Sequence, residues 1–132
     1  MINVSELRLG NVVLYKKENR IIRIALDFQH FELLGKGGMN LFFPVSLKAD
    51  QLEKCGFVEN KKYALLPQAH EYILTLPVIG TNKNEIYAWI KNNGECFARL
   101  SVNGAVASNN IYHLHQLQNL CFAVTGEEMT MK

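Results

Sequence analysis

The chain has 132 residues, the size of one domain, because single hydrophobic cores usually span roughly 100 to 150 residues. Hydrophobic residues make up 48% of it and charged residues 20%, a balance that allows a buried core and excludes wholesale disorder. The net charge of +2 is too small for a protein that mainly coats phosphate backbones.

The N-terminal residues MINVSE lack the charged start and apolar stretch of a secretory signal, so we expect a cytoplasmic protein. No apolar run approaches the roughly 18 to 20 residues that cross a bilayer, and no membrane segment is expected. Cys55, Cys96 and Cys121 are odd in number and far apart, which predicts reduced thiols that pack as small hydrophobic side chains.

The N-terminal part predicts two β-hairpins. Residues 11–17 (NVVLYKK) and 20–28 (RIIRIALDF) are rich in β-branched and aromatic residues, and Asn19 between them can adopt a left-handed backbone. A second hairpin is expected from residues 31–34 and 41–45, which the glycine-rich segment GKGG separates. The hairpins would form a small antiparallel β-meander that could close into a partial barrel.

A short helix is expected over residues 47–55. Gly56 suits the left-handed position that ends a helix, after which Phe57 can fold back on the last turn. The N-cap stays open between Ser46, which has the better capping side chain, and Lys48, where the periodic part begins.

The following residues predict a second antiparallel sheet. The Asn-Gly dipeptide at 93–94 is the strongest hairpin signal in the chain. A two-residue turn there would place Tyr87 opposite Leu100 and Trp89 opposite Ala98, whereas a bulged turn would reassign the faces. Both faces are largely apolar, so each must be covered or await a partner. The expected strands are 62–66, 72–78, 85–91 and 96–102.

The clearest helix spans residues 111–125 (IYHLHQLQNLCFAVT). We expect it to be capped by Ser108, Asn109 or Asn110 and to end at Gly126. Its leucines recur at helical spacing and should pack on the second sheet.

Two histidines lie on this helix. Helical geometry places His113 on the apolar side, where we interpret it as an imidazole at the edge of the core. His115 points away from that side and forms a stripe with Gln118, Asn119 and Phe122, which we consider the better candidate for a partner contact. More often, such a stripe borders the next structural layer.

No motif supports catalysis or ligand binding. Paired Cys or His at metal-ligand spacing and a Gly-x-Ser-x-Gly nucleophile are absent, and GKGG lacks the Lys-Ser/Thr of a phosphate loop. We therefore predict no metal, no cofactor, no small-molecule substrate and no enzymatic activity. An enzyme would depend on His113, His115 and scattered carboxylates alone.

Four cations gather at the tip of the first hairpin. Lys16, Lys17, Arg20 and Arg23 surround Glu18, and together they are candidates for contact with nucleic acid. Charged hairpin tips are, however, usually solvated and protect strands from edge pairing.

Tyr87 and Trp89 form an aromatic pair on one face of a predicted strand. They could contact a partner or stack bases, but beside Leu100 and Ala98 they fit a core better.

Both ends of the chain carry motifs: ELRLGN at 6–11, HQLQNL at 115–120 and AVTGEE at 123–128. With Pro44 and the Gly-Phe pair at 56–57, they resemble a family of small proteins from gut anaerobic bacteria and their prophages. Its pattern is E-L-R-I-G-N near the start and H-x-L-Q-N-L-Y-F-A-L-T-G-E-E-L at the end.

The resemblance implies a cytoplasmic, prophage-encoded accessory protein. The family has no known function, so it supplies no reaction, substrate or partner. This sequence departs from the pattern at Lys48, Cys121 and Met129, where Thr, Tyr and Leu are common. Among the other motif residues, the polar side chains of the stripe lack an evident packing reason.

The sequence thus predicts one α+β domain over 1–132, with lobes of about 1–57 and 58–132 that share a core. Its parts are an N-terminal β-meander, a short central helix, and a second antiparallel sheet packed by the C-terminal helix. The leading function is a non-enzymatic interaction module that binds a protein or itself. The alternative is nucleic-acid binding through the basic hairpin.

Overall fold

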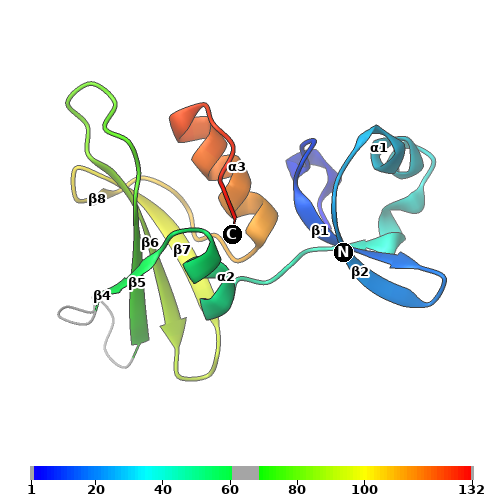
Figure 1. Ribbon diagram of the computed structural model, residues 1–132, viewed down its shortest axis with the longest axis horizontal. Helices are drawn as coiled ribbons and strands as arrows, with labels where there is room; N and C mark the ends of the chain where they lie inside the picture. The colour runs from blue at the N-terminus through cyan, green and yellow to red at the C-terminus, as the bar shows by residue number, and fades with distance from the viewer. Residues whose placement is uncertain (1, 61–68, 132) are drawn as a thin grey trace.

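The computed structural model describes residues 2–60 and 69–131, and it confirms an α+β fold with two antiparallel sheets and a C-terminal helix. The strands of these residues close no barrel. Figure 1 shows two lobes, with helix α3 (Leu114–Thr125) lying between their sheets. The predicted strand at 62–66 lies outside the described residues.

The first lobe has strand order β2-β1-β3 and the second has β4-β5-β6-β7-β8. The elements of the first lobe are η1 (Val4–Glu6), β1 (Val12–Lys17), β2 (Arg20–Ala25), α1 (Phe28–Gly35), η2 (Gly38–Leu41) and β3 (Phe42–Phe43). Those of the second, before α3, are α2 (Ala49–Lys54), β4 (Val58–Asn60), β5 (Ala69–Thr75), β6 (Asn84–Lys91), β7 (Cys96–Val102) and β8 (Ala105–Val106).

The first predicted hairpin is confirmed. Strands β1 and β2 pair without interruption from Lys17 opposite Arg20 to Val12 opposite Ala25. Both turn residues are left-handed, with φ of 50° at Glu18 and 64° at Asn19. This is the backbone of a primed two-residue turn, whose twist matches that of the strands.

The second predicted hairpin is wrong, because helix α1 occupies the place of its first strand. Asp27 caps this helix: its Oδ1 accepts hydrogen bonds from the backbone N–H groups of Gln29 (2.9 Å) and His30 (3.2 Å). The short strand β3 pairs with β1, with Leu14 opposite Phe43, so the order also differs from that of a meander.

The short central helix is confirmed as α2. Lys48 occupies the N-cap without a side-chain hydrogen bond. Gly56 is left-handed with φ of 95°, and the backbone N–H of Phe57 donates to the Leu52 carbonyl at 3.0 Å. This bonding ends the helix as predicted and carries Phe57 into the core.

The β6–β7 hairpin has the bulged turn, and the two-residue register is wrong. Lys91 N–H donates to the Glu95 carbonyl at 2.9 Å, and Gly94 is left-handed with φ of 88°. The loop therefore has three residues, and pairing shifts by one position, so Trp89 lies opposite Phe97.

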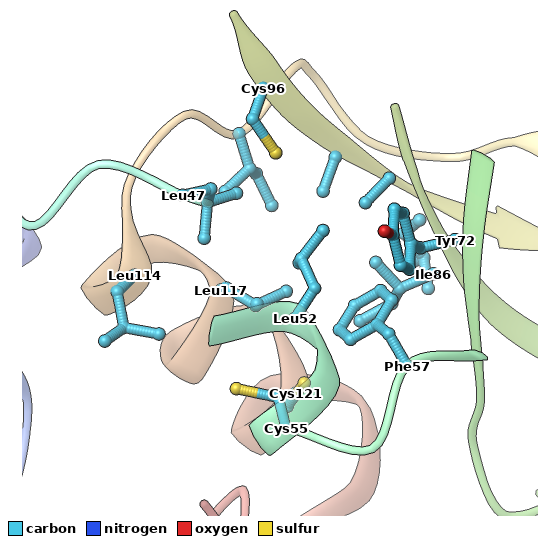
Figure 2. Close-up of a cluster of buried hydrophobic side chains, with 14 of the residues drawn as sticks. Leu47, Leu52, Cys55, Phe57, Tyr72, Ile86, Cys96, Leu114, Leu117 and Cys121 are labelled. Atoms are coloured by element: carbon cyan, nitrogen blue, oxygen red, sulfur yellow. The ribbon is translucent and has the colours of Figure 1, made fainter. Parts of the chain in front are cut away.

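The main core lies between one face of the five-stranded sheet and helices α2 and α3. Figure 2 shows Leu52 of α2 and Leu117 of α3 on the side of the helices that faces Tyr72 and Ile86 of the sheet. The smaller core of the first lobe is built around Val13, Leu34 and Phe42. Its members precede Pro44, whereas α2 and Phe57 contribute to the main core, so the two cores divide the chain near Pro44.

The three cysteines are free and buried in the main core. Burial disfavours the thiolate and raises the pKa of Cys55 and Cys96 to about 11 and that of Cys121 to about 12. They act as small hydrophobic side chains.

Helix α3 begins three residues later than predicted. Ile111 pairs with Ala98 through two backbone hydrogen bonds of 2.8 Å, so the chain is still extended there. His113 is the N-cap, in place of Ser108, Asn109 or Asn110 as expected, and Gly126 ends the helix as predicted. None of the helices in the described part of the chain is long and apolar enough to cross a membrane.

Candidate functional site

Gln118, a member of the predicted stripe, connects α3 to the first lobe. It is buried, and its Oε1 accepts a hydrogen bond from the Val12 backbone N–H at 2.8 Å. Its Nε2 donates to the Gly10 carbonyl at 3.4 Å. The side chain thus satisfies backbone groups where strand β1 begins.

Asn119 makes a second connection with three hydrogen bonds. Its Oδ1 accepts from Arg8 Nε at 3.0 Å and from Asn11 Nδ2 at 2.8 Å. Its Nδ2 donates to the Glu6 carbonyl at 2.6 Å. A single amide therefore holds three residues of the N-terminal segment.

Arg8 extends this contact toward the C-terminus. Its guanidinium pairs with Glu128 and lies 4.3 Å from the centre of the Phe122 ring. The hydrogen bond from Arg8 lowers the pKa of Glu128. The motifs at the two ends of the chain are thus the two sides of one contact, which we name the interlobe clasp: Glu6, Arg8, Asn11, Gln118, Asn119, Phe122 and Glu128.

His115 is the buried histidine of the pair, and His113 is partly exposed, so the predicted orientations are reversed. The two rings stack in parallel with centres 5.9 Å apart. Neither ring nitrogen of His115 has a hydrogen-bond partner among the described residues, and Nε2 lies 3.6 Å from Glu6 Oε2. Burial lowers the pKa of His115, which favours the uncharged ring.

A cavity of about 100 Å³ lies against these side chains, with Ile2, Asn3, Pro44 and Gln116 completing its lining. The described residues of this lining include no hydroxyl, thiol or amine nucleophile. Its size suits a few water molecules. An imidazole beside a carboxylate can exchange a proton, but the described lining residues do not indicate a substrate on which that exchange would act.

The four predicted cations lie on the β1–β2 hairpin, and all are exposed. Arg23 also reaches the second lobe: Gln51 accepts from its Nη2 at 2.7 Å when the Gln51 amide is oriented to donate to the Ser46 carbonyl. None of the four cations is in an ion pair with a described carboxylate. The hairpin is therefore a positively charged projection.

Strand β2 is the outer strand of its sheet in the described structure. Ile21 is 61% exposed and Ile22 is 41% exposed, one on each face of the strand. The Leu26 N–H points toward β1, because it donates to the Asn11 carbonyl at 2.9 Å. Along a strand, the backbone groups of successive residues point alternately toward one neighbouring strand and toward the other side. The N–H and C=O groups of Ile21, Arg23 and Ala25 consequently point away from β1.

The aromatic pair lies on the face of the second sheet opposite α2 and α3, and not beside Leu100 and Ala98. Tyr87 and Trp89 stack with ring centres 6.0 Å apart. Trp89 is only 4% exposed, and its Nε1 donates to Glu71 Oε2 at 3.0 Å. With little accessible area, the indole is not a free platform for a ligand.

Sequence reasoning missed two features. The N-terminal partners of the stripe, Glu6, Arg8 and Asn11, could have been found from the joint occurrence of the two end motifs. The open edge of β2 has no local signal, because the order of strands in a sheet depends on pairing between distant segments.

In the described part of the chain, no cluster of three or more His, Cys, Asp or Glu side chains is arranged to hold a metal ion. Comparison with known proteins gives no matching family model, no similar curated protein and no similar solved structure.

Proposed function

We propose that the protein is a non-enzymatic interaction module that binds an extended segment of a partner protein along β2. The observation that carries this proposal is the open edge of that strand. An unpaired strand edge presents backbone donors and acceptors that another strand can satisfy, which is the mode of recognition called β-strand addition.

Several features of β2 support this role. The strand has six residues, contains no proline, and pairs with β1 without a bulge. Proteins usually protect a strand edge with a proline, a bulge or charged side chains, and along β2 only the charged side chains of Arg20 and Arg23 are present. Exposed Ile21 and Ile22 add an apolar contact on each face of the strand.

The interlobe clasp supports placing the partner site on β2. Gln118 and Asn119 already bond to backbone and side chains of the first lobe, and His115 is buried. These side chains serve the fold, so a partner surface is better sought on the hairpin.

A peptide-display experiment tests the proposal. A library of random short peptides is selected on the wild type and on Ala25→Pro, because proline removes one outward N–H of β2. Ala25→Ser, which keeps that N–H, is the matched control. We expect enrichment of β-forming sequences on the wild type and on Ala25→Ser only.

Equal enrichment on Ala25→Pro, or none on the wild type, would contradict strand addition. Circular dichroism and protection of the β1 amides from hydrogen exchange would show that Ala25→Pro is folded. If it is not, hydrogen exchange of the Ile21, Arg23 and Ala25 amides in the wild type replaces it. Slower exchange with selected peptides is then the expected result.

The exposed cations favour a second candidate, which is nucleic-acid binding by the hairpin. This function predicts affinity for single-stranded or duplex DNA that falls steeply with salt. Replacing Lys16, Lys17, Arg20 and Arg23 together by Ala should abolish that binding. Binding that does not depend on salt, or its absence, would remove this candidate.

The family resemblance adds a setting to the proposal. We suggest that the protein acts in the cytoplasm as an accessory factor of prophage origin.

A further inference from the structure

We infer that the segment bound by β2 is acidic, with carboxylates opposite Arg20 and Arg23 and apolar side chains between them. This inference rests on the proposed strand addition and specifies the chemistry of the partner. It combines the charge of the hairpin with the alternation of the β-ladder.

This edge carries a net positive charge. Four cations surround a single carboxylate, that of Glu18. In the ladder, Lys17 lies directly opposite Arg20, so two cations meet at the end of the strand that an added segment would reach. Positive charges that no described carboxylate pairs attract a segment of opposite charge and repel a basic one.

The ladder also fixes the order of side chains. An antiparallel segment on the outer side of β2 would meet Ala25 first and Arg20 last. The matching order is a small residue, an apolar residue, an acid, two apolar residues and an acid. The apolar positions then lie opposite Ile24, Ile22 and Ile21.

A second copy of this chain fits the edge poorly. Antiparallel pairing of the outward backbone groups of two β2 strands about their centre would place Arg23 of each copy opposite the same arginine of the other, where the two would repel. The charge therefore favours a different, acidic chain as the occupant.

Fluorescence anisotropy with synthetic peptides tests the inference. The probe is a labelled Gly-Ala-Val-Glu-Val-Val-Glu-Gly peptide. Its controls are a version with Gln for both Glu and a shuffled version of the same composition. Opposite charges across a ladder change affinity by up to about five-fold for each pair. We expect the acidic peptide to bind about ten-fold or more tightly than either control.

A charge exchange tests the predicted register. Arg20 is exposed, so Arg20→Glu should leave the fold intact. The substitution should lower the affinity for the acidic peptide several-fold. A peptide with Lys in place of its last Glu should restore that affinity. Recovery is expected at that peptide position and not when the first Glu is replaced.

The outcomes separate the two proposals. Equal binding of the glutamine and acidic peptides would overturn the acidic preference while leaving strand addition intact. Equal binding of the shuffled peptide would overturn the register. Undiminished binding to Ala25→Pro would overturn strand addition itself. Binding only to an oligothymidine probe, lost at high salt, would overturn both in favour of nucleic acid.

Discussion

Neither nitrogen of the buried His115 ring bonds to a described residue, and burial of a polar group without such a bond costs free energy in the folded chain. An apolar side chain at this position avoids the cost. We therefore expect His115→Leu to raise the free energy of unfolding by about 1 kcal/mol at neutral pH. Urea unfolding followed by the fluorescence of Trp89 measures the change.

His70→Leu is the matched control, because the His70 side chain is 66% exposed. Its effect should stay within about 0.5 kcal/mol. A loss of stability in His115→Leu larger than in the control would show that the imidazole has a favourable partner, such as a bound water.

The burial of His115 also leads us to expect that the free energy of unfolding depends on pH. Burial lowers the pKa of His115, Glu6 raises it and His113 lowers it, and burial dominates. The pKa of His113 is also lowered by burial. Below about pH 6.5 the unfolded chain therefore binds more protons than the folded chain, and stability falls as pH falls.

Each histidine contributes up to about 1.4 kcal/mol per pH unit between about pH 6.5 and its folded pKa. We expect His115→Leu to flatten this slope in unfolding experiments from about pH 7 to about pH 5. An unchanged slope in the variant would assign the dependence to other groups.

The sequence identified His113 and His115 as a pair but reversed their orientations. For His113 the error came from extending the helix back to residue 111, since a helical wheel does not describe the N-cap residue. His115 lies within α3 and is buried because its side of the helix faces the first lobe. Ile111 bonds to Ala98 as a strand does, and α3 begins at Leu114. Strand pairing depends on a distant segment, which local periodicity does not reveal.

At the scale of single elements, the turn between β6 and β7 predicts a measurable cost. Gly94 is left-handed, which costs an alanine about 1 to 2 kcal/mol. Gly35 has no positive φ and open space around its α-carbon. We expect Gly94→Ala to destabilise the chain by that amount and Gly35→Ala to stabilise it by about 0.5 kcal/mol.

Thermal or urea unfolding of the two alanine variants gives the comparison. Gly94→Asn should retain most of the stability, because asparagine tolerates the left-handed region. A neutral Gly94→Ala would indicate that residue 94 does not need the left-handed backbone.

Elements defined by local signals were predictable. Asn-Gly located the β6–β7 hairpin, and Gly56 and Phe57 located the end of α2. Helix α1 was missed because its capping signal, Asp27 with His30 three residues later, was weaker than the hairpin suggested by the glycines after it. The order β2-β1-β3 depends on long-range pairing and has no local signal.

At the scale of the whole molecule, the interlobe clasp joins segments near the two ends of the chain. The ELRLGN segment and the HQLQNL segment are distant in sequence and bond to each other across the lobes. The sequence showed their joint occurrence, and the structure supplies the contact. Helix α3 belongs to the main core and also holds strand β1, so it couples the lobes.

This coupling predicts the effect of Asn119→Ala. The variant loses hydrogen bonds to Arg8, Asn11 and the Glu6 carbonyl, at a cost of about 2 to 3 kcal/mol. Asn109→Ala is the control, because Asn109 is exposed and its side chain makes no hydrogen bond to described residues. Its effect should stay within about 0.5 kcal/mol.

The mode of unfolding distinguishes a clasp from simple packing. Trp89 fluorescence follows the second lobe, and hydrogen exchange of the β1 amides follows the first. In the wild type we expect both probes to give one free energy of unfolding, because the lobes open together. In Asn119→Ala, the free energy of opening measured from exchange of the β1 amides should be lower than the free energy of unfolding measured from Trp89 fluorescence. The reason is that the first lobe can then open separately. Coincident values in the variant would show that the packing of Val12 and Leu14 on the main core couples the lobes without the clasp.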